Sequence, residues 1–295
     1  ASIDLRLFLT NASNPAKEFP VALQTRLTSN LVRHFPLAPL PRQSLRRLEM
    51  ARNERFSFQV ALRGDRRHTV RIETEAPDGW KVRVRRVGLV PVLHMNDPLP
   101  GNALESDAPD RIPGYVPDPL FDEQEMLLPA GESHAFWIDV VPGNDAEPGR
   151  HGVRVRVLPD SLRARDLDLA VDLHDLTIEP RRDFDVTHWF YADALIDWYR
   201  TDQFDARCWR LCRAYLLDLA EHGQNMVYVP MFTPPLDGVK RPTQLLRVTR
   251  NAAGRYRFDW RDVRRYVLLA REQGLQRFEW THLFSQWGVR HAIRI

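Results

Sequence analysis

The apolar residues of this chain follow one period in its first part and another in its second, and this change constrains the fold most. Before residue 183, apolar and polar residues alternate in short runs, which is the period of a half-buried β-strand. After Pro180-Arg181-Arg182, strand-like runs alternate with amphipathic helical patterns. The sequence therefore predicts two domains, 1–182 and 183–295, and a length of 295 residues is sufficient for both.

The predicted strands of the first domain are short and are separated by turns rich in Pro, Gly and Asp. They are residues 22–29, 55–63, 68–74, 80–92, 134–141, 152–158 and 167–178. Strands of this length without a convincing amphipathic helix predict an antiparallel β-sandwich.

One long segment of the first domain, residues 95–129, is predicted to be a loop because it is rich in Pro, Asp and Gly. Its apolar residues Tyr115, Leu120 and Phe121 are expected to pin the loop onto a neighbouring domain. Isolated acids such as Asp139 are interpreted as turn or edge residues that face solvent. The domain shows no catalytic pattern, so we expect it to support the second domain or to contact carbohydrate.

The second domain is predicted to consist of repeated strand–helix units. The expected elements are strands at 186–191, 225–231 and 275–281, helices at 205–222 and 261–273, and a hairpin turning at 251–254. Asp205 and Asp259 are predicted to cap the helices, and Gly223 and Gly274 to end them. Trp260, Val263, Val267 and Ala270 are expected to face inward in the second helix.

Two and a half such units predict an incomplete (β/α)8 barrel, truncated at residue 295. Either the chain is a fragment of a longer protein, which we favour, or another chain completes the half-barrel. An open half-barrel exposes a strand edge, so self-association is a further expectation. The carboxyl ends of the three strands, around residues 187–191, 225–232 and 278–288, carry aromatic and hydrogen-bonding side chains. Side by side, they would form the floor of a ligand site.

The composition excludes several other classes of protein. The 42 basic and 39 acidic residues are interleaved, which argues against nucleic-acid binding. No run approaches the roughly 20 apolar residues that span a bilayer, so a soluble protein without a membrane partner is expected. Cys208 and Cys212 supply at most half a zinc site and are interpreted as buried apolar residues. No metal or organic cofactor is expected, and the compartment is left open, with the cytoplasm slightly favoured.

Several motifs, in the same order along the chain, resemble those of one family of enzymes. They are Arg52-Asn53-Glu54-Arg55-Phe56-Ser57-Phe58-Gln59-Val60, Trp189-Phe190-Tyr191-Ala192-Asp193, His222-Gly223-Gln224-Asn225-Met226, Phe232-Thr233-Pro234-Pro235-Leu236-Asp237, Arg241-Pro242-Thr243 and His282-Leu283-Phe284-Ser285-Gln286-Trp287-Gly288. These segments resemble glycoside hydrolase family 123 and the related group called domain of unknown function 4091.

The resemblance implies an N-terminal β-sandwich followed by a catalytic barrel that acts on glycosides of N-acetylhexosamine, typically N-acetylgalactosamine. Family members are similar to substrate-assisted retaining enzymes, in which the 2-acetamido oxygen of the sugar attacks the anomeric carbon. An Asp orients that group, and the adjacent Glu is the acid/base. Residues 183–295 contain no Asp-Glu dipeptide, and the only one in the chain is Asp122-Glu123. We therefore transfer no catalytic residue, and expect the chain alone to be inactive.

The resemblance does imply which residues form one wall of the substrate site. Its expected sugar contacts are Tyr191 and Asp193 after the first strand, Phe232 and Arg241 after the second, and His282 and Trp287 after the third. Trp189, Phe190 and Phe284 are interpreted as core residues, whereas Glu279 and Trp280 are left open between the two roles. The expected partner is an amino-sugar glycoside. The alternative is a non-catalytic carbohydrate-binding or scaffold protein.

Overall fold

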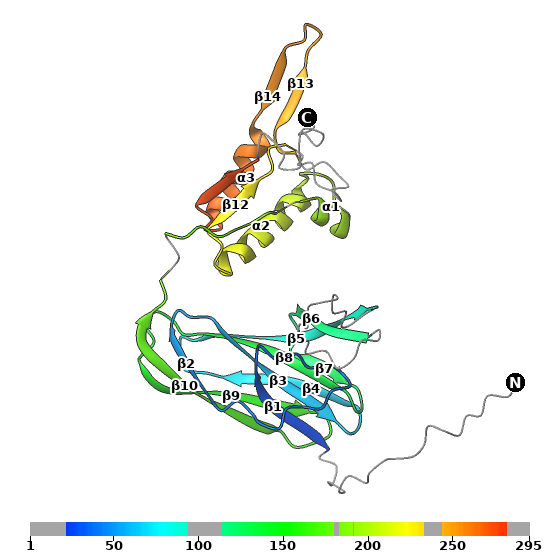
Figure 1. Cartoon of the computed structure of the whole chain (residues 1–295), viewed down its shortest axis with the longest axis vertical. Helices are drawn as coiled ribbons and strands as arrows, with labels where there is room; N and C mark the ends of the chain where they lie inside the picture. Colours follow the sequence, from blue (N-terminus) through cyan, green and yellow to red (C-terminus); the bar gives the residue numbers. More distant parts are fainter. Residues whose placement is uncertain (1–21, 94–113, 180–182, 191, 233–243, 282–295) are drawn as a thin grey trace, which may run out of the picture. The chain divides into compact units, whose positions relative to one another are not determined.

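The computed structural model describes residues 22–93, 114–179, 183–190, 192–232 and 244–281. The chain divides into two compact units, Ala1–Glu179 and Pro180–Ile295. The described part of the first unit is built from strands, and that of the second combines strands with helices (Figure 1).

The described residues of the first unit form two five-stranded sheets. One has the order β1-β3-β8-β5-β6, with β1 Leu23–Ser29, β3 Phe56–Gly64, β8 Ser133–Val141, β5 Lys81–Val92 and β6 Gly114–Phe121. The other has the order β2-β10-β9-β4-β7, with β2 Arg47–Arg52, β10 Arg165–Thr177, β9 Gly149–Pro159, β4 His68–Glu75 and β7 Glu125–Leu128. All neighbouring strands are antiparallel except β2 and β10, which are parallel.

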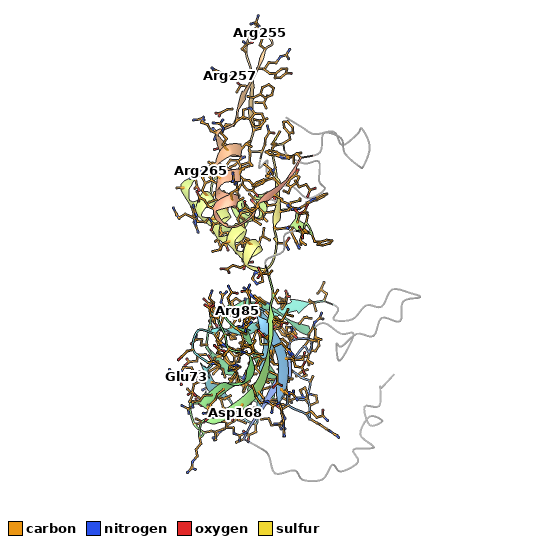
Figure 2. The ribbon with its side chains drawn as sticks, turned by 90° about the vertical axis from the view of Figure 1, so that its left-hand side faces the viewer. Glu73, Arg85, Asp168, Arg255, Arg257 and Arg265 are labelled. Carbon is orange, nitrogen blue, oxygen red and sulfur yellow. The ribbon has the colours of Figure 1, made fainter. Side chains whose placement is uncertain are left out.

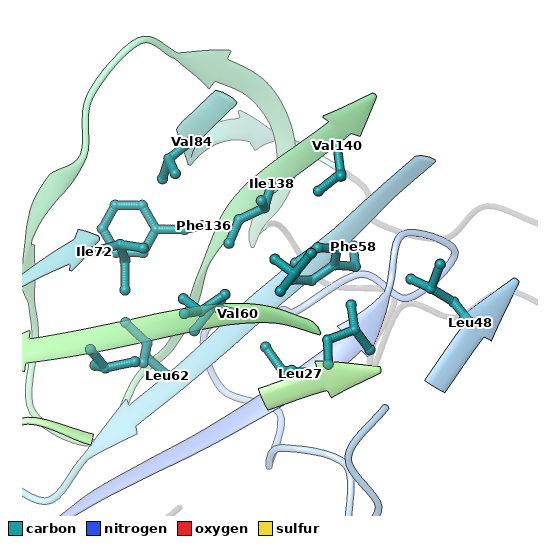
Figure 3. Packing of buried hydrophobic residues seen from close by; sticks show 14 of the residues in the cluster. Leu27, Leu48, Phe58, Val60, Leu62, Ile72, Val84, Phe136, Ile138 and Val140 are labelled. Carbon is teal, nitrogen blue, oxygen red and sulfur yellow. The ribbon is translucent and has the colours of Figure 1, made fainter. Parts of the chain in front are cut away.

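One hydrophobic core joins the two sheets. Alternate residues of each strand point inward, as Phe58, Val60 and Leu62 do from β3 (Figure 3). The second sheet supplies residues such as Ile72, and the members of the cluster are at most 8% exposed. This two-layer packing around one core explains why the period-2 pattern dominates the first part of the sequence. The expected β-rich domain is thus confirmed, and each of the seven predicted strands is present.

The prediction of one long loop at residues 95–129 is wrong in its second part, because two strands form there. Gly114–Phe121 is β6 and Glu125–Leu128 is β7, whereas residues 95–113 lie outside the described range. β6 contains Pro117 and Pro119, which disguise it, but it is the last strand of its sheet and tolerates residues without an N–H. Phe121 packs over Gly88 of β5, where a side chain would overlap its ring. The three apolar residues expected to pin a loop therefore belong to an edge strand.

The interpretation of Asp139 as a turn or edge residue that faces solvent is also wrong, since it lies within β8 and is only 6% exposed. Its carboxylate accepts hydrogen bonds from Ser57 Oγ at 2.6 Å and Trp137 Nε1 at 2.9 Å, and it pairs with Arg85. A buried charge requires such partners, because an unpaired one would be strongly destabilising. The sequence shows the acid but not its three partners, which come from three strands.

The second unit contains a parallel three-stranded sheet of order β11-β12-β15. Its elements are β11 Thr187–His188, α1 Asp193–Tyr199, α2 Ala206–Glu221, β12 Met226–Val229, β13 Arg247–Arg250, β14 Tyr256–Asp259, α3 Arg261–Glu272 and β15 Arg277–Trp280. Helices connect the parallel strands, and β13 and β14 form the predicted hairpin before α3 (Figure 1). The partial α/β character is thus confirmed, and α1 is an element that the sequence did not predict.

The helix ends follow the sequence signals closely. The Asp205 carboxylate accepts the Cys208 N–H at 2.6 Å and so caps α2, while Gly223 and Gly274 follow α2 and α3 with positive φ angles of 86° and 103°. Asp259 accepts the Arg261 N–H at 3.1 Å, although the N-cap position itself is Trp260.

The apolar faces of the two helices pack on the sheet, with one exception. Cys208 and Cys212 are free and buried, and Val263 and Ala270 of α3 are buried in the same cluster. Trp260, expected to face inward, is 46% exposed, because it precedes the helix and continues the outward face of β14.

The histidine of the first unit that lies against Thr28 is expected to make stability depend on pH. His34 is 5% exposed, its Nε2 lies 2.8 Å from Thr28 Oγ1, and burial lowers its pKa from 6.5 to about 4. Between these values the unfolded chain binds more protons, so the free energy of unfolding falls as the pH drops through this window. The shift corresponds to a loss on the order of 3 kcal/mol. Urea unfolding of the protein at several pH values measures it.

The control is a pair of histidine variants of the same unit. His34→Gln should remove this part of the pH dependence, whereas the exposed His174→Gln should retain it. An equal slope in the His34 variant and the parent protein would contradict the assignment.

Candidate functional site

The carboxyl ends of β11, β12 and β15 lie at one edge of the parallel sheet. Thr187 pairs with Met226, which pairs with Arg277, and the register continues to Tyr228 opposite Glu279. Continuing the register of β11 by one residue places Trp189 in the same row. Since Val227 and Val229 pack into the cluster formed with the helices, the row of Trp189, Tyr228 and Glu279 belongs to the other face of the sheet.

The row is held together by direct contacts between its side chains. The indole Nε1 of Trp189 lies 3.1 Å from each carboxylate oxygen of Glu279 and donates to that group. The Trp189 and Tyr228 rings lie 6.1 Å apart at 41°. Trp189 is 42% exposed, so the interpretation of this residue as core is wrong, and Glu279 is half-buried.

A hydroxyl network fixes the strand ends beneath this row. Thr281 Oγ1 accepts hydrogen bonds from Tyr228 Oη at 3.1 Å and from Met231 N at 3.0 Å, and donates to Val229 O at 2.9 Å. Tyr266 of α3 donates from its Oη to the carbonyl of Tyr228 at 3.2 Å. The Thr281 side chain, directly after β15, thus bonds to three polar groups of β12 and the residues that follow it, and two of these, Met231 N and Val229 O, also bond to each other at 2.8 Å.

The electrostatics of the row combine one carboxylate with neutral donors. Burial raises the pKa of Tyr228, and the neighbouring Glu279 raises it further, while the hydrogen bond with Thr281 lowers it. Burial also raises the pKa of Tyr266 well above its usual value. Both phenols are therefore neutral donors near neutral pH. Aromatic faces beside a carboxylate are suited to bind a pyranose, since the rings stack on its C–H face and the acid accepts from hydroxyls.

The site residues predicted from the sequence are distributed over described and undescribed parts of the chain. Tyr191, Arg241, His282 and Trp287 lie outside the described residues, as does Phe284. Asp193 is the first residue of α1, where an acid also interacts favourably with the helix dipole. Phe232 and Phe190 are partly buried against the cluster formed with the helices. These sugar contacts stay predictions, and Trp280, left open before, is 47% exposed.

Tyr228 of the row and Thr281 beneath it were not predicted as a site from the sequence. Tyr228 lies inside the apolar run of β12, and Thr281 directly follows β15 without a distinctive motif. Only the register of the two strands, which pairs Val229 with Trp280, could have shown that they meet.

The part of the chain that the structure describes has neither a metal site nor a membrane-spanning helix. There, no three His, Cys, Asp or Glu side chains are grouped so that they could hold a metal ion. None of the described helices has the length and apolar character needed to cross a bilayer.

A comparison with family models decides the relationship of the second unit. Its match is to the model described as glycoside hydrolase 123, catalytic domain, and covers residues 189–295. This part of the chain matches family 123. The match begins at Trp189, the first residue of the row, and it confirms the resemblance seen in the sequence motifs.

One solved structure supports the fold. A family 123 glycoside hydrolase from Clostridium perfringens, described in work on glycolipid glycan hydrolysis, matches with a TM-score of 0.67 at 12% identity. The alignment covers 86% of this chain and 46% of that one, so the chain spans about half the length of this relative. A FixG-related protein from Vibrio parahaemolyticus matches with a TM-score of 0.26 at 5% identity, covering 52% of this chain and 96% of that one. No curated protein matches the chain.

The Asp122-Glu123 pair belongs to the first unit and not to residues 189–295, which match family 123. The two acids follow β6 in the first unit, and their side chains are 76% and 53% exposed. Each pairs with an arginine of β5, Asp122 with Arg83 at 3.4 Å and Glu123 with Arg86 at 2.6 Å. These are surface ion pairs, which contribute little to stability.

Thr281→Val should destabilise the second unit. The valine keeps the shape but leaves the Tyr228 hydroxyl without its partner, whereas the Met231 N–H and the Val229 carbonyl keep their hydrogen bond to each other at 2.8 Å. One unsatisfied buried hydroxyl costs about 1–3 kcal/mol, so we expect a loss of about 2–3 kcal/mol once the weakened bonds of Met231 and Val229 are included. Thr281→Ser, which retains the hydroxyl, should lose about 1 kcal/mol or less. Denaturant unfolding followed by tryptophan fluorescence measures both, and equal losses would contradict the network.

Proposed function

We propose that residues 183–295 are the first part of a (β/α)8 barrel that belongs to a retaining glycoside hydrolase of N-acetylhexosaminides. The observation that carries this proposal is the family 123 match, which starts at the row of Trp189, Tyr228 and Glu279. Three parallel strands joined by helices support the barrel, since sites in such barrels lie at the carboxyl ends of the strands. The likeness to the Clostridium perfringens enzyme supports the fold alone.

The described edge is proposed to act as a wall of the sugar site. The exposed indole face of Trp189 would stack on the C–H face of the pyranose, and Glu279 would accept hydrogen bonds from its hydroxyls. Tyr228 and Thr281 are proposed as positioning residues, because their hydrogen bond holds together the strand ends that carry Trp189 and Glu279. Tyr191, Asp193, Phe232, Arg241, His282 and Trp287 are proposed as the further sugar contacts of this wall.

The proposed chemistry is that of a substrate-assisted retaining enzyme. The carbonyl oxygen of the 2-acetamido group forms a bond to the anomeric carbon while the bond to the leaving oxygen breaks. A carboxylic acid gives its proton to the leaving oxygen, and a neighbouring carboxylate stabilises the positive charge on the amide nitrogen. Water then opens the ring intermediate and restores the acetamido group with retained configuration.

The acid and the carboxylate of this reaction are proposed to lie on a later strand, outside these 295 residues. Residues 183–295 contain no Asp-Glu dipeptide, and the chain aligns with 46% of the Clostridium perfringens enzyme. The gene sequence downstream of the codon for Ile295 tests this directly. Further strand–helix units with a strand that ends in Asp-Glu are expected, and their absence would contradict the proposal and favour a carbohydrate-binding or scaffold protein.

The chain by itself should bind an N-acetylhexosaminide without hydrolysing it. Methyl N-acetyl-β-galactosaminide is expected to bind in a calorimetric titration, and Trp189→Phe and Glu279→Gln should each weaken binding about tenfold, as the loss of about 1.4 kcal/mol implies. Glu272→Gln on α3, an exposed acid away from the row, is the matched control. Release of nitrophenol from a chromogenic N-acetylgalactosaminide by the chain alone would contradict the location of the catalytic pair.

The open edge of the half-barrel gives a second prediction. Within the described residues, β11 and β15 each pair with one strand only, so both are edge strands of the sheet. We therefore expect the chain to self-associate, and sedimentation velocity should show a species heavier than 34.4 kDa. A monomer at all concentrations would contradict this.

A further inference from the structure

We propose that a groove lined by arginines between α2, α3 and the base of the hairpin binds an acidic glycan, one that carries sulfate or carboxylate groups. The proposal rests on the proposed function, because it assigns a second contact to a protein that already acts on glycans. It goes beyond that function in naming a separate surface and a charged class of ligand.

The groove consists of two hollows that share residues. One, of about 700 Å³, lies along β14 and the start of α3, and the other, of about 730 Å³, lies between α2 and α3. Arg261 and Arg264 line both. We call the combined feature the arginine groove. Each hollow has the volume of pockets that hold small ligands, roughly 300–1,000 Å³.

The helical period explains why the arginines gather there. In α3, Arg261, Arg264 and Arg265 are three and four residues apart and so share one face of the helix. The buried residues Val263 and Tyr266 lie on the face that packs on the sheet. Arg210 and Arg213 of α2 face the same groove, and Figure 2 shows Arg265 on α3 and Arg257 on the hairpin.

The charge of the groove is strongly positive and largely unneutralised. Six arginines and two acids line it, and both acids are already paired, Asp259 with Arg261 at 2.7 Å and Glu272 with Arg213 at 2.8 Å. Arg261 lowers the pKa of Asp259 to about 2, so that acid is charged at any ordinary pH.

The other arginines of the groove have no acidic partner among the described residues. Arg210, Arg257, Arg264 and Arg265 form no ion pair with any of them. Such a set of guanidinium groups is complementary to an anion, since their planar N–H groups match the oxygens of a sulfate or carboxylate.

Aromatic side chains line the same groove and favour a sugar. At the hairpin end, Phe258 and Trp260 are 53% and 46% exposed. Between the helices, the guanidinium of Arg265 lies 4.4 Å from the ring centre of Trp209. Trp209 is 4% exposed, and its indole N–H has no hydrogen-bond partner among the described residues. A buried donor without a partner is rare in folded proteins and is consistent with a site that a ligand completes.

An acidic glycan fits these observations better than a neutral one or a nucleic acid. A neutral sugar leaves the four guanidinium groups without anions. Nucleic acid also pairs with arginine and stacks on aromatic rings, but the same unit matches a glycoside hydrolase family. The charge, the aromatic surfaces and the family match together point to a polysaccharide with anionic groups.

The test uses the whole chain and chondroitin sulfate, a polymer of N-acetylgalactosamine and uronic acid that carries both kinds of anion. Calorimetric titration should show binding that weakens as salt increases, because salt screens exposed charges. The double variant Arg264→Gln, Arg265→Gln should weaken binding at least tenfold. Chemically desulfated chondroitin should bind at least threefold more weakly than the sulfated polymer.

A double variant outside the groove provides the matched control. It combines Arg255→Gln at the hairpin tip (Figure 2) with Arg207→Gln on α2, removes the same charge and should change binding less than twofold. An equal loss in the two double variants would overturn the proposal, since only net charge would then matter. Tighter binding of a DNA oligonucleotide of equal charge would also overturn it, in favour of a nucleic-acid surface.

Failure of this inference and failure of the proposed function give different results. The groove variants should not change the binding of methyl N-acetyl-β-galactosaminide, and Glu279→Gln should not change the binding of chondroitin sulfate. If the neutral sugar binds and chondroitin sulfate does not, the groove proposal is wrong and the proposed function stands. If chondroitin sulfate binds in a groove-dependent way and the neutral sugar does not bind, the proposed function is wrong and the groove proposal stands.

Discussion

The parallel register of β11, β12 and β15 is the constraint on which the candidate site depends. In a parallel sheet the carboxyl ends of all strands meet at one edge, and the register decides which side chains share a row. Here it brings Trp189 and Glu279, which are 90 residues apart, to within a hydrogen bond of each other across Tyr228. A slip of one residue in β15 would move Glu279 to the face covered by helices and bury its charge. The Thr281 hydroxyl opposes such a slip, because it bonds to three groups of the neighbouring strand and its continuation.

The two units solve the burial of polar groups in different ways. In the first, the sheets enclose an apolar core, and the buried Asp139 is balanced by Arg85, Ser57 and Trp137 from its own sheet. In the second, the helices cover one face of a short sheet, and the other face carries the polar row. A face with a half-buried carboxylate and an exposed indole is a poor core but a good surface for a hydroxyl-rich ligand. The arginines of α2 and α3 lie on the outer helix faces, so the proposed groove uses residues that the core does not need.

The sequence predicts the parts of this fold that depend on local periodicity and on single capping residues. The alternation in β3, the Asp205 cap and the positive φ of Gly223 and Gly274 are all of this kind. It fails where neighbours in space decide. β6 was hidden by its prolines, which an edge strand tolerates, and the burial of Asp139 was hidden because two of its partners, Ser57 and Arg85, lie on other strands. For the site, the sequence predicts the strand ends and the family, but not the row. The Trp189–Glu279 contact requires the register, which no local pattern contains.

The indole N–H of Trp189 offers the most direct test of the claim that this row contacts the sugar. The chain has eight tryptophans, so a nitrogen–proton correlation spectrum contains few indole signals, and Trp189→Phe assigns the one of interest. Because this N–H donates to Glu279, a sugar that binds the row must change its environment. On titration with methyl N-acetyl-β-galactosaminide, the Trp189 signal is predicted to shift with the same saturation curve that calorimetry gives. Binding that leaves this signal unchanged while other indole signals move would contradict the account.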